Sequence, residues 1–223
     1  MRVVILIPAY NSAATLGDVL SKCLEQHSRQ ALLVVDDGSS DDSIGIAKHF
    51  GVPYISHAKN QGKGAALRTG FRRILQSNAD AILTLDSDGQ HDPTWIPSFI
   101  RSMTENNWDL VIGSRMHDLK TMPFDRQFSN KTTSKILSFR CGCKIEDSQC
   151  GYRLIRTSVL RQIELTTNQF DTETEIVLKA CLKGFKIGFV PISTIYHQGG
   201  GSSIRRASDT MRFLRVLVRS FFW

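Results

Sequence analysis

ADAILTLDSDGQHD, residues 79–92, is the stretch that decides the expected fold, because an apolar run ends abruptly in carboxylates. The run 79–85 predicts a buried strand, and the polar residues after it predict the loop at that strand's carboxyl end. Residues i and i+2 of an extended chain project to the same side, so Asp86, Asp88 and Gln90 can present three oxygen atoms to one cation. Oxygen-only ligation favours Mg²⁺ or Mn²⁺, which keep coordination positions open for phosphates.

A polar turn that starts the next helix is the simpler interpretation of the same residues. Asp92 precedes Pro93 at the expected start of that helix, so we expect Asp92 to be its N-cap. The acids and the amide before it are more than a cap needs, although an Asp-x-Asp pair alone is a weak signal.

Strands and helices alternate around this stretch over the first 113 residues. Strands are expected at residues 2–7, 31–35, 52–56, 79–85 and 109–113, and helices at 14–26, 42–50, 62–76 and 93–106. This order favours an α/β fold with a parallel, doubly wound sheet, in which ligands bind outside the carboxyl ends of the strands. The polar clusters of the sequence follow expected strands, which is the first indication of a site.

The second half is less regular. Residues 117–128 are expected to form a mobile loop, followed by helices at 129–139 and 172–182 and strands at 152–155 and 186–192. No repeat or linker is present, so we expect one domain over residues 1–203, with a nucleotide-binding half of about 1–115 and an acceptor half of about 116–203. Residues 204–223 form a separate basic segment.

Composition is ordinary for a globular protein of 223 residues, with 41% hydrophobic and 22% charged residues. No run of about 18 apolar residues is present, so no membrane span is expected. Five cysteines at irregular spacing predict reduced thiols and a cytoplasmic location. The net charge is +7, and five arginines in residues 204–223 stand against one acid, Asp209.

This basic tail predicts an amphipathic helix. One face gathers six apolar side chains and another gathers three arginines: Met211, Leu214, Leu217, Val218, Phe221 and Phe222 against Arg212, Arg215 and Arg219. Such a helix is typical of membrane-surface binding, which predicts a peripheral position on the inner face of the membrane. The alternative is a helix that packs on the domain and turns a basic face outward.

Four ordered motifs identify a family. They are Ile7-Pro-Ala-Tyr-Asn11, Val34-Val-Asp-Asp-Gly-Ser-Ser-Asp-Asp42, Asn60-Gln-Gly-Lys-Gly-Ala-Ala-Leu-Arg68 and Leu85-Asp-Ser-Asp-Gly-Gln-His-Asp-Pro93. The set resembles the family 2 glycosyltransferases, which have a GT-A fold with a mostly parallel central sheet flanked by helices. Gly113-Ser-Arg115 and Asp147-Ser-Gln-Cys-Gly-Tyr-Arg153 resemble the polyprenyl-phosphate branch, of the dolichyl-phosphate mannose or glucose synthase type. The resemblance covers about residues 1–195.

On the donor side, the resemblance implies a site for a UDP- or GDP-linked sugar. The residues that match are Pro8, Ala9, Tyr10 and Asn11 for the nucleoside, Asp36 and Asp37 for the base, Lys63 for a phosphate, and Asp86, Asp88 and Gln90 for the metal and the diphosphate. A polar turn at Asp36-Asp37 and a solvated Lys63 are the simpler alternatives.

On the acceptor side, the resemblance implies a phosphate held by arginines. Arg115 follows an expected strand and can form a bidentate pair with a phosphate. Arg126 and Ser129 resemble the pair that receives the acceptor phosphate, and Asp147, Gln149 and Arg153 fall on the acceptor side. A surface arginine is the alternative for Arg153. The branch usually has a lysine where this chain has Ser203, and Arg205 or Arg206 is the candidate replacement.

These expectations favour an inverting, metal-dependent transfer to a polyprenyl phosphate, with Asp88, Arg115 and Asp147 as the catalytic residues. A lipid phosphate is already ionised and needs no strong base. The alternative acceptor is a sugar hydroxyl, which requires a carboxylate base, and Asp147 and Glu175 are the candidates. A sugar-1-phosphate nucleotidyltransferase and a nucleic-acid-binding domain fit less well, because the first needs a glycine- and arginine-rich loop after the first strand and the second needs interleaved aromatic and basic residues.

Overall fold

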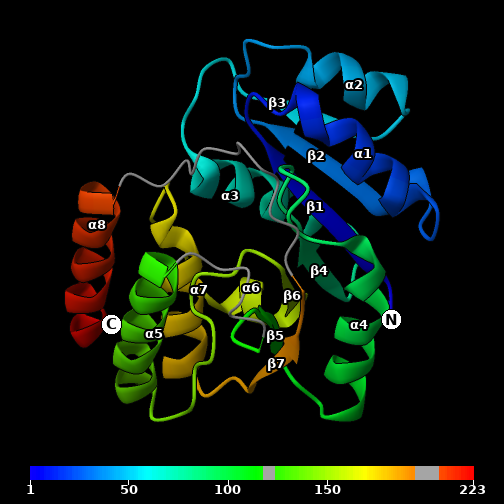
Figure 1. The fold of residues 1–223 in the computed structure, drawn as a ribbon. Coiled ribbons are helices and arrows are strands. Elements are labelled where there is room, and N and C mark those ends of the chain that lie inside the picture. Colours follow the sequence, from blue (N-terminus) through cyan, green and yellow to red (C-terminus); the bar gives the residue numbers. More distant parts are fainter. Residues whose placement is uncertain (118–123, 194–205) are drawn as a thin grey trace.

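A seven-stranded sheet organises the computed structural model, which describes residues 1–117, 124–193 and 206–223 (Figure 1). The strand order is β3-β2-β1-β4-β6-β5-β7. The strands are β1 Val3–Ala9, β2 Leu32–Asp36, β3 Tyr54–Ser56, β4 Ala81–Thr84, β5 Leu110–Ser114, β6 Arg153–Arg156 and β7 Ile187–Pro191. The apolar runs of β1, β2, β4 and β5 are buried because helices cover both faces of the sheet.

Strand β6 runs antiparallel to its neighbours β4 and β5, while the other pairings are parallel. Arg153, the first residue of β6, pairs with Thr84 near the end of β4 and with Ile112 of β5. The loop before β6 therefore lies at the same sheet edge as the loops after β4 and β5. The expected parallel sheet is confirmed for its other strands, and the reversed strand brings residues 147–152 to the edge where ligands are expected.

The helices are α1 Ala13–Leu24, α2 Ser43–His49, α3 Lys63–Ile74, α4 Ile96–Glu105, α5 Phe124–Cys141, α6 Thr157–Gln162, α7 Asp171–Leu182 and α8 Arg206–Arg219. Figure 1 shows α1, α2 and α4 on one side of the sheet and α3 and α7 on the other, with α5 and α8 outside α7. Helix α3 lies close to β1, because a Cβ on its Gly70 would meet Leu6 Cδ1 at 2.2 Å. Three short 3₁₀ turns, η1 Arg29–Ala31, η2 Pro93–Trp95 and η3 Ser220–Phe222, complete the chain.

Most expected elements are confirmed with ends that differ by one to three residues. The expected loop at 117–128 is wrong in its last part, because α5 already begins at Phe124; residues 118–123 lie outside the described part of the chain. Helix α5 buries Asn130, Ser134 and Leu137 at helical spacing, and this mixed polar and apolar stripe weakens the periodicity that a sequence reading needs. Helix α6 was not expected. Asp92 is confirmed as an N-cap, since its side chain accepts a hydrogen bond from the Thr94 N–H.

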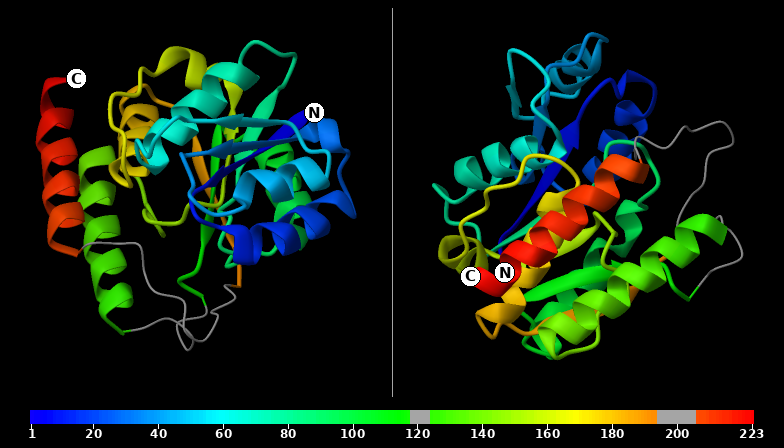
Figure 2. Two further views of the ribbon diagram at one scale, coloured as in Figure 1. Left: turned by 90° about the horizontal axis from the view of Figure 1, so that it is seen from above. Right: turned by 90° about the vertical axis from the view of Figure 1, so that its left-hand side faces the viewer.

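The C-terminal helix α8 packs on α7, and Figure 2 shows it running alongside α5 and α7. Val216 and Ser220 are buried, and Arg140 of α5 donates hydrogen bonds to the Ser220 hydroxyl and carbonyl oxygens. The opposite face carries exposed apolar side chains: Met211, Leu214, Val218, Phe221 and Phe222. The helix therefore both packs on the domain and turns an apolar face outward. Among the described residues, none of the helices has the length and apolar character needed to span a bilayer.

Candidate active site

Hydrogen bonds join the loops after β1, β2 and β4 at one edge of the sheet. Asn11 adopts a left-handed conformation (φ 48°), and its side-chain oxygen accepts a hydrogen bond from the Ser40 N–H at 2.8 Å. The hydroxyls of Ser12 and Ser87 lie 2.8 Å apart, which links the loop after β1 to the Asp86–Gln90 loop. The three motifs that stand far apart in the sequence thus form one structural unit.

The end of β1 and the Asp36–Asp37 pair face this unit. Pro8 and Ala9 are buried, whereas Tyr10 is 50% exposed. Asp37 accepts hydrogen bonds from the Gln61 and Gly62 N–H groups at 3.0 and 2.7 Å, and its Oδ1 lies 2.7 Å from His57 Nδ1.

Asp36 is also engaged with the protein, since the Ser56 hydroxyl donates to it at 3.0 Å. Both carboxylates are almost fully buried. The structure therefore uses both to hold loops, and Asp37 fixes the turn that begins α3.

Lys63 bridges two carboxylates at the centre of the site. Its Nζ lies 2.7 Å from Asp86 Oδ1 and 2.8 Å from Glu173 Oε1, which belongs to α7. Burial alone would lower the pKa of Lys63, but Asp86 and Glu173 outweigh it and raise that pKa above its ordinary value. Burial likewise would raise the pKa of Asp86, but the charge of Lys63 holds it well below its ordinary value. Lys63 and Asp86 are therefore both charged at neutral pH.

Two uncharged residues shape the surroundings of Asp86. A Cβ on Gly151 would lie 2.7 Å from Asp86 Oδ2 and 2.9 Å from Lys63 Nζ, so only glycine leaves room for this ion pair. His91 is buried, accepts from the Asp86 N–H at 3.4 Å and stacks on Tyr152. Burial lowers the pKa of His91, so the ring is neutral.

Asp88 and Gln90 lie at the surface end of the same loop. Asp88 is exposed, and its Oδ1 accepts a hydrogen bond from the Gln90 N–H at 3.0 Å. No cluster of three or more histidine, cysteine or acidic side chains able to bind a metal occurs in residues 1–117, 124–193 and 206–223. The predicted set, two acids and an amide, is smaller than such a cluster. These oxygen ligands nonetheless fit a hard cation. The Asp88 carboxylate is open to solvent, and the Asp86 carboxylate already attracts the ammonium group of Lys63.

Arg115 and Asp147 form a bidentate ion pair on the acceptor side. The Nε and Nη2 atoms of Arg115 lie 2.7 and 2.9 Å from the two carboxylate oxygens of Asp147. Asp147 is fully buried and also accepts hydrogen bonds from Asn130 Nδ2 and the Gln149 N–H. Burial would raise the pKa of Asp147, but Arg115 and the other donors lower it. Asp147, one candidate base for a hydroxyl acceptor, therefore accepts several hydrogen bonds in this structure and holds Arg115 in place.

In this pair the Nε and Nη2 atoms of Arg115 are directed at Asp147, and the expected contact of Arg115 with a phosphate stays a prediction. Ser129 and Gln149 do come together, since Gln149 Nε2 donates to the Ser129 hydroxyl at 3.3 Å. Arg126 lies three residues before Ser129 on α5 and is half-buried.

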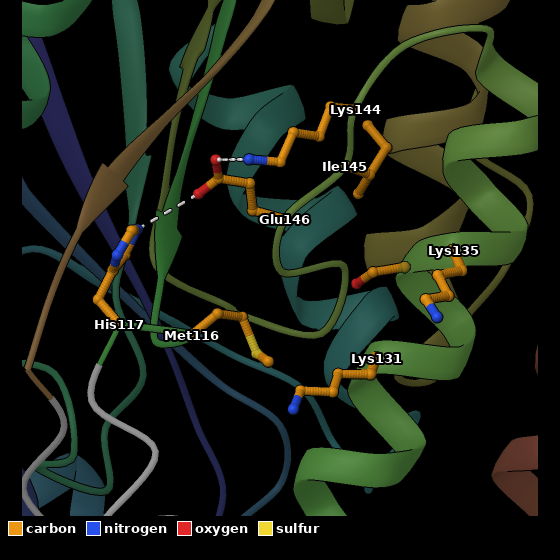
Figure 3. Close-up of a pocket in the computed structure, with 8 residues that line it drawn as sticks. Met116, His117, Lys131, Lys135, Lys144, Ile145 and Glu146 are labelled. Carbon is orange, nitrogen blue, oxygen red and sulfur yellow. Dashed lines mark hydrogen bonds and ion pairs between the residues drawn. The ribbon is translucent and has the colours of Figure 1, made fainter.

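A hollow of about 240 Å³ lies beside the Arg115–Asp147 pair (Figure 3). Lys131 and Lys135 project towards it from α5, and Lys144 faces it from the following loop, where its Nζ lies 2.9 Å from Glu146 Oε1. Three lysines and one glutamate give this side of the site a positive charge.

Arg153 does not reach the acceptor side as expected. Its side chain is buried, and Nε, Nη1 and Nη2 donate to the carbonyl oxygens of Cys150, Glu173 and Ser148 at 2.6–2.8 Å. Arg153 therefore ties the loop before β6 to α7. The alternative base Glu175 is also fully buried and accepts hydrogen bonds from Thr166, Thr167 and Lys179.

Sequence reasoning missed Glu173, His91 and the role of Gly151. The signal for Glu173 was available, because Asp171, Glu173 and Glu175 alternate at the start of a predicted helix, where three acids exceed what capping needs. His91 and Gly151 stand inside quoted motifs, but their contacts depend on the reversed strand β6. Ser203 and Arg205 lie outside the described residues, and Arg206 is the first residue of α8, so the expected replacement of the lysine stays a prediction.

The chain belongs to glycosyl transferase family 2, which matches residues 4–164. It is therefore a glycosyltransferase, and its relatives support a place in the polyprenyl-phosphate branch. It is 30% identical to the UDP-N-acetylglucosamine–dolichyl-phosphate N-acetylglucosaminyltransferase of Methanococcus voltae, over 96% of this chain and 93% of that protein. It is 28% identical to the polyprenol monophosphomannose synthase of Mycolicibacterium smegmatis, over 92% and 84% of the two chains.

The fold is GT-A, as solved structures show. Glucosyl-3-phosphoglycerate synthase from Mycobacterium tuberculosis, in complex with UDP, superposes with a TM-score of 0.76 at 18% identity, over 98% of this chain and 79% of that one. The same enzyme with Mn²⁺, UDP and glucosyl-3-phosphoglycerate gives a TM-score of 0.75. At this identity the likeness establishes the fold, and the chemistry must come from the site.

Proposed function

We propose that this glycosyltransferase moves a sugar from a nucleotide-diphosphate sugar to a polyprenyl phosphate at a membrane surface, with inversion at the anomeric carbon. The observation that carries the proposal is the burial and hydrogen bonding of the Asp147 and Glu175 carboxylates. A hydroxyl acceptor needs a carboxylate base, and both candidates are buried under several donors. A phosphate monoester acceptor is ionised near neutral pH and needs only cations to position it.

The donor side is assigned to the united loops after β1, β2 and β4. Tyr10 is exposed beside Asn11 and supplies a surface for the base, while Asp36 and Asp37 keep the loops around it fixed. We assign the diphosphate to the space above Asp86 and Asp88. Lys63 contributes a permanent positive charge at the amino end of α3, where anions are favoured.

A divalent cation fits the carboxylates of Asp86 and Asp88 with the amide of Gln90, and we assign Mg²⁺ or Mn²⁺ to them. When bound, it would neutralise the diphosphate and improve it as a leaving group. Lys63 keeps Asp86 ionised and oriented, and Gly151 leaves the room that this arrangement needs.

The acceptor side is assigned to the positive surface made by α5 and the loop before β6. Arg126 and Ser129 on α5 would hold the acceptor phosphate, with Gln149 orienting Ser129. Arg115 adds its charge from the position fixed by Asp147. Lys131 and Lys135 line the adjacent hollow and extend the attraction for an anionic acceptor.

Helix α8 is assigned to the membrane surface. Its outward face combines Met211, Leu214, Val218 and Phe222, each 43–84% exposed, with the flanking Arg215 and Arg219. Exposed apolar side chains beside arginines favour an interface of anionic headgroups and acyl chains. This places the acceptor lipid and the enzyme on one surface.

The test is a transfer assay with a panel of UDP- and GDP-sugars and Mn²⁺ or Mg²⁺, with and without polyprenyl phosphate. We expect sugar transfer to the lipid with one nucleotide, abolished by EDTA and reduced roughly 10²-fold or more in Asp88→Ala. Asp18→Ala, which removes an exposed acid on α1, is the matched control.

Transfer to a glycan hydroxyl with no dependence on polyprenyl phosphate would overturn the proposed acceptor. Full activity of Asp88→Ala would overturn the assigned metal and diphosphate site.

A further inference from the structure

Three of the five cysteines gather at one end of the molecule, away from the candidate active site. Cys141 ends α5, Cys143 follows it in the next turn, and Cys181 lies in the last turn of α7. The Sγ atoms of Cys143 and Cys181 lie 3.8 Å apart. The thiols come from segments 38 residues apart, so the fold and not the local sequence brings them together.

We propose that Cys143 and Cys181 form a reversible disulfide by thiol exchange with a small-molecule disulfide. Cys143 is exposed and accessible to such a reagent, whereas Cys181 is half-buried behind it. The remaining cysteines, Cys23 and Cys150, are buried and have no part in it.

Only a small movement separates the two sulfurs from bonding distance, since a disulfide bond is about 2.05 Å long. The turn that carries Cys143 has room to make that movement. Gly142 before it has φ 68°, a conformation that glycine adopts without strain, and nothing lies within 4 Å of the position of a Cβ there. Closing the gap needs a shift of this exposed turn towards α7 and leaves the helices in place.

The exchange balances in two steps. The Cys143 thiolate attacks the reagent disulfide, forming a mixed disulfide and releasing one thiolate. The Cys181 thiol then loses its proton to solvent, its sulfur attacks Cys143 Sγ, and the second reagent thiolate leaves. Two protein thiols are oxidised to one disulfide, and the reagent disulfide is reduced to two thiols.

The bond would join the two segments on which the end of α8 rests. Arg140, next to Cys141, donates to Ser220 and lies 4.7 Å from the centre of the Phe221 ring. Lys179, two residues before Cys181, lies 4.5 Å from the centre of the Trp223 ring. Oxidation at this site therefore fixes the support of the C-terminal helix.

The test uses the full chain treated with oxidised glutathione, alkylated and digested without reduction, and followed by mass spectrometry over time. We expect one peptide pair joined through Cys143 and Cys181, two hydrogen masses lighter than the free pair, which separates again with dithiothreitol. Cys143→Ser and Cys181→Ser should abolish it, and Cys23→Ala should leave it unchanged. Cys141→Ser should still form the same link, because Cys143 and Cys181 are the two thiols that it joins.

Separate glutathione adducts on Cys143 and Cys181 without a link would overturn the proposal. A dominant link from Cys141 to Cys181 would overturn the pairing. Circular dichroism of each serine variant verifies that a lost link does not come from a lost fold.

Discussion

Lys63 Nζ lies 2.7 Å from Asp86 Oδ1, so the first helical residue after one glycine-rich loop neutralises the first acid of the Asp-x-Asp motif. Glu173 holds the same ammonium from the other side. The positive charge of Lys63 on α3 is thus shared between Asp86, in the loop after β4, and Glu173 on α7.

Lys63→Met leaves Asp86 and Glu173 facing each other without a cation. We expect a loss of unfolding free energy on the order of 2–4 kcal/mol, because both carboxylates are largely buried. Urea unfolding followed by circular dichroism measures this loss. The exposed Lys22→Met on α1 is the control and should change stability by less than about 0.5 kcal/mol.

The stability gap between wild type and Lys63→Met should depend on pH in a defined direction. The pKa of Asp86 is lowered in the folded protein, so its contribution is present above its ordinary pKa of 3.8 and is lost as pH falls below that value. The pKa of Lys63 is raised, so its contribution is present below its ordinary pKa of 10.5 and is lost above it. Unfolding curves should therefore show a constant gap between about pH 5 and pH 9 that narrows at lower pH. A gap that widens in acid would contradict this account of the pair.

Gly151→Ala should disturb the site while leaving the fold intact. The added Cβ would lie 2.7 Å from Asp86 Oδ2, so the carboxylate must turn away from its present position. We expect transfer activity to fall at least tenfold, since displacements of about 1 Å in a site have effects of that size or larger. Gly17→Ala on α1 is the matched control, because its Cβ meets only ordinary contacts at 3.8 Å and alanine favours a helix. Equal activity of the two variants would show that the position of Asp86 does not matter.

Asp147→Asn and Arg115→Lys should act as one unit. Asparagine at position 147 removes the negative charge that orients the Arg115 guanidinium, and lysine at position 115 cannot form the bidentate ion pair. Each change should raise the KM for polyprenyl phosphate more than it lowers kcat, and the double variant should be little worse than either, with a coupling of about 1–3 kcal/mol. Arg101→Lys, at an exposed position on α4, is the control. If Asp147 were instead the base, Asp147→Asn would remove kcat and Arg115→Lys would not.

The outward face of α8 should govern vesicle binding. Replacing Met211, Leu214 and Val218 together by glutamine removes three side chains that are 43–61% exposed, so the packing through Val216 is kept. We expect flotation with anionic vesicles to fall at least tenfold, because each buried apolar side chain contributes about 1 kcal/mol or more. Tyr54→Gln, an exposed aromatic on β3 at the far edge of the sheet, is the control. Unchanged flotation of the triple variant would show that the outward face of α8 does not bind the membrane.

The sequence by itself determined the alternation of strands and helices and the place of the polar motifs at strand ends. Both are local properties, because a buried strand needs an apolar run and the Asp86–Gln90 loop is predicted where that run ends. The family and the donor-side motifs followed from the same segments. The N-cap at Asp92 was predictable for the same reason, since it depends on residues two positions apart.

Only the tertiary structure decided what the charged side chains do. The reversed strand β6 places residues 147–152 against the loops after β4 and β5, and no local pattern encodes the direction of a short apolar strand. For this reason Arg153 reads as a surface or acceptor residue in the sequence, yet it is buried against three carbonyl oxygens. Glu173 likewise joins Lys63 across 110 residues of chain. Whether a charged side chain binds a ligand or stabilises the fold depends on the groups that surround it, and long-range packing determines which groups those are.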